Sequence, residues 1–141
     1  MTANIIIAED NDQVAAELIK IVKSCIENTS GDKAVIGLSG GSLPKFLANG
    51  MKSDLGKDID WSKVIFIFCD ERMVPFEDPE STLGLYRKLF ADTSIKDEQF
   101  VKVSVTMDVE SAAKDYEKKL VELMGNEPKA DLLLLGMGPD G

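Results

Sequence analysis

The sequence predicts an α/β fold in which a mostly parallel sheet is flanked by helices. Short apolar runs alternate with helical patterns along the 141 residues, as in chains that form one domain, residues 1–141. The clearest run, residues 64–69, holds six apolar residues without alternation, which indicates a strand buried on both faces. A glycine-rich turn at residues 39–42 follows another apolar run and precedes a helical pattern.

The first half of the chain contains two predicted strands, each followed by a helix. Residues 4–8 form a brief β-branched run, which predicts the first strand. Asp10, with Gln13 three residues later, is a capping signal that opens the first helix. Residues 34–38 give a short buried strand, and the second helix begins near Leu43.

The second half repeats the alternation after the strand at residues 64–69. A helix is expected over roughly residues 81–90, and a weaker strand over residues 100–105. Asp108 is placed to cap a third long helix, and Gly125 stands where its C-terminal cap belongs. Residues 131–135 give a last buried strand.

Composition excludes several classes of function. The 16 Lys and Arg against 25 Asp and Glu give a net charge of −9, which disfavours nucleic acid and anionic lipid as partners. No apolar run approaches the roughly 20 residues of a membrane span. Cys25 and Cys69 lie in apolar stretches, which predicts reduced core residues of a cytosolic protein. Histidine is absent, so the chain lacks the commonest general base and metal ligand.

Three loops are expected at the carboxyl ends of the strands, where ligands bind in parallel sheets. They cover residues 37–42, 70–75 and 136–141. In the first, adjacent glycines Gly40 and Gly41 allow close backbone approach to an anion, and Ser42 adds a hydroxyl donor. The loop therefore predicts a phosphate site; the alternative is a tight turn without a ligand.

The second loop brings two carboxylates and a guanidinium to the end of a strand. Asp70, after six apolar residues, is a candidate proton acceptor if its carboxylate is partly desolvated. Arg72 offers a planar fork for phosphate or carboxylate, whereas Glu71 is expected to face away and to serve the structure. A surface salt-bridge cluster that stiffens the loop is the alternative.

The third loop matches the pattern G-x-G-x-x-G after an apolar strand. We do not interpret it as a dinucleotide site, because Pro139 stands where a helix would have to continue and no acidic ribose ligand follows. Asp140, between proline and glycine, also fits ordinary turn chemistry.

Three further residues are assigned structural roles. Asp131, at the head of the last strand, is expected to cap or tether the backbone. Arg87 is interpreted as a solvated side chain, and Trp61 as a packing residue.

The three loops together resemble the signatures of the glucosamine-6-phosphate isomerase/6-phosphogluconolactonase family. The motifs are Gly-Leu-Ser-Gly-Gly-Ser at residues 37–42, Asp-Glu-Arg-Met-Val-Pro at 70–75 and Leu-Leu-Gly-Met-Gly-Pro-Asp-Gly at 134–141. The stretch Glu-Ser-Thr-Leu-Gly-Leu-Tyr-Arg at residues 80–87 is similar to the animal-type lactonases in particular. The resemblance implies a Rossmann-like three-layer fold, truncated at its C-terminal side.

The resemblance also implies an activity, namely hydrolysis of 6-phosphoglucono-δ-lactone to 6-phosphogluconate, a step of the oxidative pentose phosphate pathway, without metal or organic cofactor. It places catalytic roles on Asp70 and Asp140. Substrate binding falls to Gly40, Gly41, Ser42, Arg72 and Gly138.

In the family, Asp140 belongs to an Asp-Gly-His signature whose histidine is the expected base, and the sequence ends at Gly141. We therefore expect these 141 residues alone to be inactive and poorly stable, and the parent protein to be a cytosolic, monomeric lactone hydrolase acting on a sugar phosphate. The alternatives are a glucosamine-6-phosphate deaminase, a non-catalytic sugar-phosphate-binding module and, from the last loop alone, a nicotinamide-binding domain.

Overall fold

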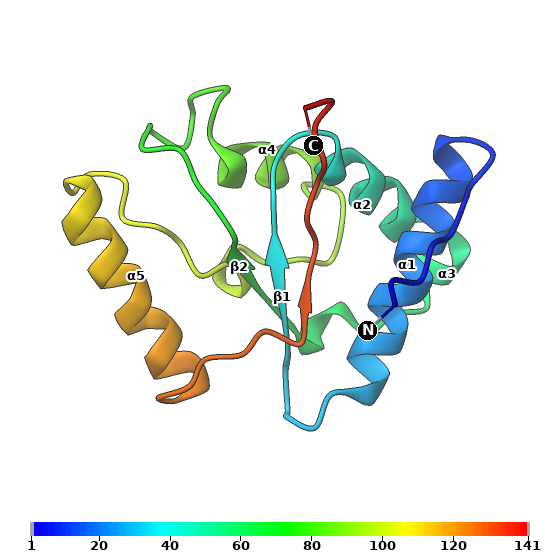
Figure 1. Ribbon diagram of the computed structural model, residues 1–141, viewed down its shortest axis with the longest axis horizontal. Coiled ribbons are helices and arrows are strands. Elements are labelled where there is room, and N and C mark those ends of the chain that lie inside the picture. The colour runs from blue at the N-terminus through cyan, green and yellow to red at the C-terminus, as the bar shows by residue number, and fades with distance from the viewer. Residues whose placement is uncertain (1, 141) are drawn as a thin grey trace.

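The computed structural model describes residues 2–140 of the chain and confirms the predicted α/β fold. Its centre is a parallel three-stranded sheet in the order β2-β1-β3, formed by β1 (Ala34–Leu38), β2 (Val64–Phe68) and β3 (Leu132–Leu133). Figure 1 shows helices on opposite sides of this sheet, with α1 (Asn11–Asn28) on one side and α5 (Val109–Met124) on the other.

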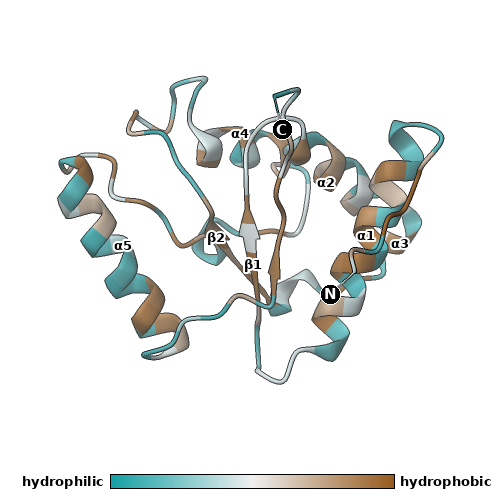
Figure 2. Cartoon of the chain, viewed as in Figure 1, coloured by the Kyte–Doolittle hydropathy of each residue, from teal (hydrophilic) through white to brown (hydrophobic). Residues whose placement is uncertain are grey.

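The core lies between one face of the sheet and the helices α1, α2 (Leu43–Lys52) and α4 (Thr82–Leu89). Ile36, at the centre of the sheet, pairs with Phe66 on one side and with Leu132 on the other, and its side chain is fully buried. Figure 2 shows that the strands are among the most apolar parts of the chain. Their burial against the helices is what fixes the positions of the loops that follow them.

Helix starts follow the capping residues that the sequence predicts. The Asp10 side chain accepts a hydrogen bond from Gln13 N–H at 2.8 Å, and the Gln13 side chain accepts one from Glu9 N–H at 2.6 Å. Asp108 accepts from the third residue of α5, and Gly125 ends that helix with φ of 86°. These side chains satisfy N–H groups that have no partner within the helix.

Short elements not expected from the sequence complete the layer of helices. They are the one-turn helix α3 (Asp54–Lys57) and the 3₁₀ turns η1 (Trp61–Lys63) and η2 (Asp97–Gln99). Trp61 is buried, as predicted for a packing residue, and its indole N–H donates to Gly56 O at 2.8 Å. Within residues 2–140, no helix is both long and apolar enough to cross a membrane.

Two predicted strands are wrong, because each lacks a ladder of backbone partners. Residues 4–8 form no strand, and Ile5 and Ile7 are 82% and 88% exposed. In residues 100–105 only Phe100 forms an isolated bridge, to Phe66 of β2. A β-branched run becomes a strand only where its backbone pairs with a neighbouring strand.

A tyrosine hydroxyl takes the place of the missing ladder beside β2. Tyr116 of α5 accepts a hydrogen bond from Phe68 N–H at 2.8 Å and donates one to Val101 O at 3.0 Å. Burial raises the pKa of Tyr116 to about 12, so the hydroxyl keeps its proton. The segment after Phe100 is thereby held near β2 without becoming a strand.

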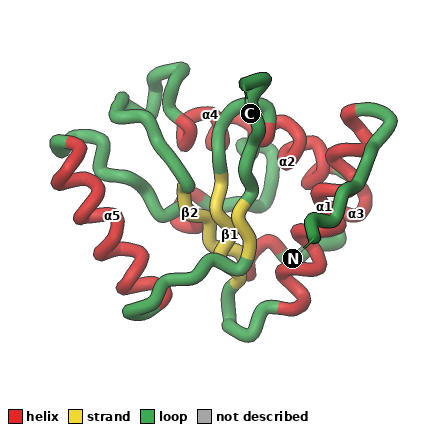
Figure 3. Tube along the Cα trace, in the orientation of Figure 1, coloured by secondary structure: helices red, strands yellow, loops and turns green. Residues whose placement is uncertain are grey.

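The last strand is shorter than the sequence predicts. Residues 131–135 contain only the two-residue β3, and the chain on either side of it is drawn as loop in Figure 3. Leu134 N–H still donates to Gly37 O at 2.9 Å. The prediction that the cysteines are core residues is also wrong, because Cys25 is half-buried and Cys69 is exposed. Both are free thiols.

Candidate functional site

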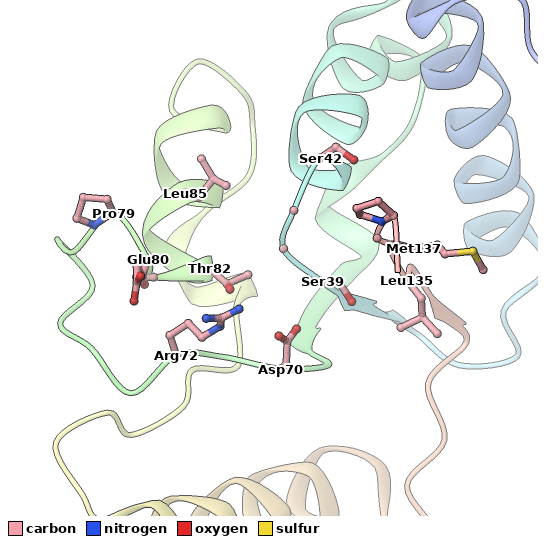
Figure 4. Close-up of a pocket in the computed structure, with 16 residues that line it drawn as sticks. Ser39, Ser42, Asp70, Arg72, Pro79, Glu80, Thr82, Leu85, Leu135 and Met137 are labelled. Atoms are coloured by element: carbon pink, nitrogen blue, oxygen red, sulfur yellow. The ribbon is translucent and has the colours of Figure 1, made fainter. Parts of the chain in front are cut away.

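The three loops predicted at the carboxyl ends of the strands line one cleft of about 770 Å³ (Figure 4). Gly41 comes from the loop after β1, Asp70 and Arg72 from the loop after β2, and Gly138 from the segment after β3. Parallel strands end at the same edge of a sheet, which is why loops far apart in the sequence meet there.

The loop after β1 has the geometry of an anion-binding turn. Gly41 has φ of 73°, in the region that favours glycine, and nothing lies within 4 Å of the position a Cβ would take. It leads into α2, whose N-cap Ser42 makes no side-chain hydrogen bond to the helix. The first N–H groups of α2 are therefore left without the usual side-chain cap, and they begin at the rim of the cleft.

A buried tyrosine holds this loop in place. Tyr86 of α4 is fully buried, and its hydroxyl donates to Ser39 O at 2.7 Å. Desolvation in this position raises the pKa of Tyr86, so its hydroxyl remains a donor across the physiological range. The carbonyl of Ser39 is thereby fixed directly before the two glycines.

The loop after β2 separates its three charged residues as the sequence suggests. Figure 4 shows Asp70 and the Arg72 guanidinium as part of the cleft wall. Glu71 turns to the helix instead, where its two carboxylate oxygens accept from Thr82 N–H at 2.7 Å and Leu83 N–H at 2.9 Å. Its structural role is confirmed.

The expected desolvation of Asp70 is not found. The residue follows the buried β2 strand, but it is exposed at the open side of the cleft. Its carboxylate lines the cleft, where it is open to a polar ligand or a water molecule.

The segment after β3 brings Gly136 and Gly138 to the cleft, but not Asp140. Gly136 approaches the loop after β1, because a Cβ built on it would lie 3.8 Å from Gly40 O. Asp140 lies in an exposed turn, with its carboxylate folded back towards Gly138. Gly141, the last residue of the predicted motif, lies outside the described residues.

Six of the seven predicted site residues therefore line the same cleft, and Asp140 lies next to it. They are Gly40, Gly41, Ser42, Asp70, Arg72 and Gly138. Within residues 2–140, no group of three or more His, Cys, Asp or Glu side chains is arranged to hold a metal ion.

Sequence reasoning missed one further part of the cleft lining, at the start of α4. It is lined by Pro79, Glu80, Ser81, Thr82 and Leu85. The signal was present in the sequence, since a helix that follows β2 in this fold must begin near the carboxyl edge of the sheet. Ser81 marks that beginning, because its hydroxyl accepts from Gly84 N–H at 3.0 Å.

Of the residues with predicted structural roles, Asp131 is confirmed and Arg87 is not. Asp131 tethers the backbone by accepting from Val35 N–H at 2.7 Å. Arg87 is not simply solvated, because it pairs with Asp97 at 2.7 Å and lies over the ring of Phe76 at 5.0 Å. This guanidinium, together with Lys102, lowers the pKa of Asp97 to about 2.

Comparison with known proteins agrees with this geometry. The model of the family described as glucosamine-6-phosphate isomerases/6-phosphogluconolactonase matches residues 9–141, which include all three loops. The chain belongs to this family. The family resemblance deduced from the three motifs is thus confirmed.

Relatives in the family cover most of the chain. It is 40% identical over 131 residues to 6-phosphogluconolactonase of Bos taurus, a match that spans 89% of this chain and 51% of the relative. It is 37% identical over 141 residues to a probable 6-phosphogluconolactonase of Drosophila melanogaster, spanning 97% of this chain and 56% of the relative. The chain thus spans about half the length of these curated relatives.

Solved structures show the same fold. A 6-phosphogluconolactonase from Trypanosoma cruzi superposes with a TM-score of 0.82 at 27% sequence identity. The superposition covers 96% of this chain and 59% of that one. The parallel sheet with flanking helices is therefore the Rossmann-like arrangement of this family.

Proposed function

We propose that the protein carrying this sequence hydrolyses 6-phosphoglucono-δ-lactone to 6-phosphogluconate. The observation that supports this most strongly is the cleft, which places an uncapped helix N-terminus, a guanidinium and a carboxylate around one space. A phosphate ester requires the first two, and an ester hydrolase requires polar groups near the bond to be broken. The lactonase names of the relatives support the same proposal.

In this proposal the phosphate of the substrate lies at the loop after β1. The backbone of Gly40 and Gly41 and the hydroxyl of Ser42 contact it, and Arg72 supplies charge-assisted hydrogen bonds. The anchored phosphate holds the lactone ring over the segment that contains Gly138. The energy of phosphate binding, at a distance from the carbonyl that reacts, thus serves to orient that carbonyl.

Hydrolysis itself needs a water molecule that loses a proton as it attacks the carbonyl carbon. The ring C–O bond then breaks, and the proton is returned to the departing oxygen. We assign these transfers to Asp70, which lines the cleft, and to Asp140, which lies next to it. The family resemblance places a histidine base directly after Gly141. A general base of this kind contributes on the order of 10²- to 10⁴-fold to the rate.

Joining the chain to the second half of the bovine lactonase gives a direct test. We expect the joined protein to hydrolyse the lactone far faster than its spontaneous opening, as measured by proton release. The 141-residue chain, which carries the proposed phosphate contacts, should bind 6-phosphogluconate. A joined protein that folds but neither binds this product nor hydrolyses the lactone would contradict the proposal.

Two alternatives are outcomes of the same assay. Release of ammonia from glucosamine 6-phosphate by the joined protein would favour a deaminase. Binding of 6-phosphogluconate without hydrolysis of the lactone by the joined protein would favour a non-catalytic sugar-phosphate-binding module.

We also propose that the protein acts in the cytosol as a monomer. The two free thiols, Cys25 and Cys69, are suited to a reducing compartment. Microscopy of a tagged protein and its mass in solution test the two parts separately.

A further inference from the structure

Two helices begin at the cleft, and both present their N-terminal ends to it. α2 begins after Ser42 and α4 begins after Ser81, and both of these capping residues line the cleft. A helix N-terminus attracts anions, because its first N–H groups lack helical partners and the positive end of its dipole lies there. A phosphate entering the cleft therefore meets two possible positions.

At the α4 end, that position is filled by the protein itself. The carboxylate of Glu71 accepts from Thr82 N–H at 2.7 Å and from Leu83 N–H at 2.9 Å. Ser81 Oγ accepts from Gly84 N–H at 3.0 Å. The first three N–H groups of α4 are thus bonded within the chain, two of them to a full negative charge.

At the α2 end, no carboxylate of residues 2–140 accepts from the first N–H groups of the helix. No side chain caps the helix at Ser42, and Pro44 has no N–H to offer. Gly41 has φ of 73°, and no atom lies within 4 Å of the place where its Cβ would be. The two helix ends therefore differ in one respect that matters to an anion, since only one carries an internal carboxylate.

We propose that Glu71 determines the orientation of the bound substrate. Its carboxylate occupies the N-terminus of α4 as an internal anion, so that a substrate phosphate is excluded from that end and directed to α2. The proposal rests on the proposed function for the identity of the ligand, a phosphate ester. Glu71 acts by exclusion and does not itself contact the reacting atoms, so it is a specificity-determining and positioning residue.

A second contact of Glu71 links this exclusion to the residue that binds the anion. The same carboxylate accepts from Arg72 N–H at 2.8 Å. The backbone from which the Arg72 side chain extends into the cleft is thereby fixed to the start of α4. One carboxylate thus closes the α4 end and sets the position from which Arg72 reaches the phosphate.

Titration of the 141-residue chain with inorganic phosphate, followed residue by residue by NMR, tests the proposal. In the unchanged chain we expect the amide signals of Gly41 and Ser42 to shift, and those of Thr82 and Leu83 to stay. In Glu71→Ala and Glu71→Gln the last two signals should also shift, and the number of phosphates bound should rise from one to two.

A matched control comes from the same loop. Glu77→Gln removes an equal charge from an exposed side chain that, among the described residues, accepts no hydrogen bond from Thr82 or Leu83, and it should behave like the unchanged chain. Hydrogen exchange gives a readout without any ligand. The amides of Thr82 and Leu83 should exchange at least tenfold faster in Glu71→Ala, because their acceptor is gone.

The possible failures are distinguishable. Phosphate-dependent shifts of Thr82 and Leu83 in the unchanged chain, or a single phosphate bound by both Glu71 variants in folded form, overturn the role of Glu71. Unchanged amide exchange in Glu71→Ala overturns it as well. Absence of any shift at Gly41 and Ser42 would instead count against the proposed function, while the exchange experiment still decides the contacts of Glu71.

Discussion

Two walls of the cleft are attached to the molecule in different ways. The wall formed by the loops after β1 and β2 is fastened to α4 at two points. Tyr86 bonds the carbonyl of Ser39, and Glu71 bonds the first N–H groups of the helix. Among residues 2–140, the segment after β3 makes no side-chain hydrogen bond to α4, and its Leu135 and Met137 are 67% and 87% exposed.

The difference concerns how firmly each part of the cleft is held before a ligand binds. The proposed phosphate contacts belong to the fastened wall, so their geometry is set before a ligand arrives, and little ordering is required on binding. Asp140 belongs to the other wall and lies outside the cleft lining. Matched substitutions in the two walls and in their contacts with α4 separate the two contributions.

Replacing Gly84 or Gly136 by alanine should give the largest difference in stability between two variants. In Gly84→Ala the new Cβ would lie 2.1 Å from Phe76 O, so the loop after β2 must move away from α4. We expect a loss of about 3 kcal/mol in the free energy of unfolding, measured with urea. Gly136→Ala in the other wall meets only Gly40 O at 3.8 Å and should change it by less than about 0.5 kcal/mol. Equal losses would contradict the contrast between the walls.

Removal of the cleft guanidinium should produce the next largest effect, on binding. Arg72→Ala should weaken binding of 6-phosphogluconate by about 1.5–3 kcal/mol, because a charge-assisted hydrogen bond is lost. Titration calorimetry measures this directly. Arg87→Ala is the control, since Arg87 pairs with Asp97 away from the cleft and its removal should leave the affinity unchanged. An unchanged affinity in Arg72→Ala would assign this side chain to the structure of the loop.

Removing either of two tyrosine hydroxyls tests whether the hydrogen bond to Ser39 matters for anion binding. Tyr86→Phe should lower the free energy of unfolding by about 1 kcal/mol and also weaken product binding, because the Ser39 carbonyl loses its donor. Tyr116→Phe removes hydrogen bonds to Phe68 and Val101, outside the cleft, and should lower stability without weakening binding. Similar affinities in the two variants would show that the tyrosine fastening does not matter for the anion site.

The smallest expected effect is a dependence of stability on pH. Arg87 and Lys102 hold the pKa of Asp97 at about 2, against an ordinary value of 3.8. The unfolded chain therefore takes up the proton first, and the stabilisation is present above pH 4 and lost as the pH falls towards 2. Because the Asp97 side chain is 43% exposed, solvent screening limits the loss to less than about 1 kcal/mol.

Unfolding curves for the unchanged chain and Asp97→Asn, at pH 5 and at pH 2.5, measure this contribution. The variant should lose less stability between the two pH values. Asp92→Asn, in the exposed turn before η2, serves as the control. If Asp97→Asn and Asp92→Asn lose stability equally with pH, the ion pair does not contribute.

Elements whose signals are local were predictable from the sequence. The unbroken apolar run of β2, the cap at Asp10 and the paired glycines before α2 each identify an element by residues within a few positions of one another. Six of the seven predicted site residues line the cleft for a related reason, because each lies in a loop that follows one of the three parallel strands.

Features that depend on distant partners were not predictable. The segment after Phe100 has the composition of a strand, but a tyrosine 48 residues away from Phe68 takes the bonding position beside β2. The pairing of Arg87 with Asp97 and the exposure of Cys69 likewise depend on which chain segments pack together. Asp70 is exposed although it directly follows the buried strand β2, and no local pattern encodes that.

The hydroxyl of Tyr116 has a consequence for how copies of the chain meet. An outer strand with free N–H and C=O groups is a template on which another molecule can build, and fibrous aggregates grow in this way. Along β2 the N–H of Phe68 is bonded to Tyr116, and the carbonyl of Phe66 is bonded to Val101. These backbone groups cannot pair with a strand of a neighbouring molecule, so the edge of the sheet at β2 is protected against fibre growth.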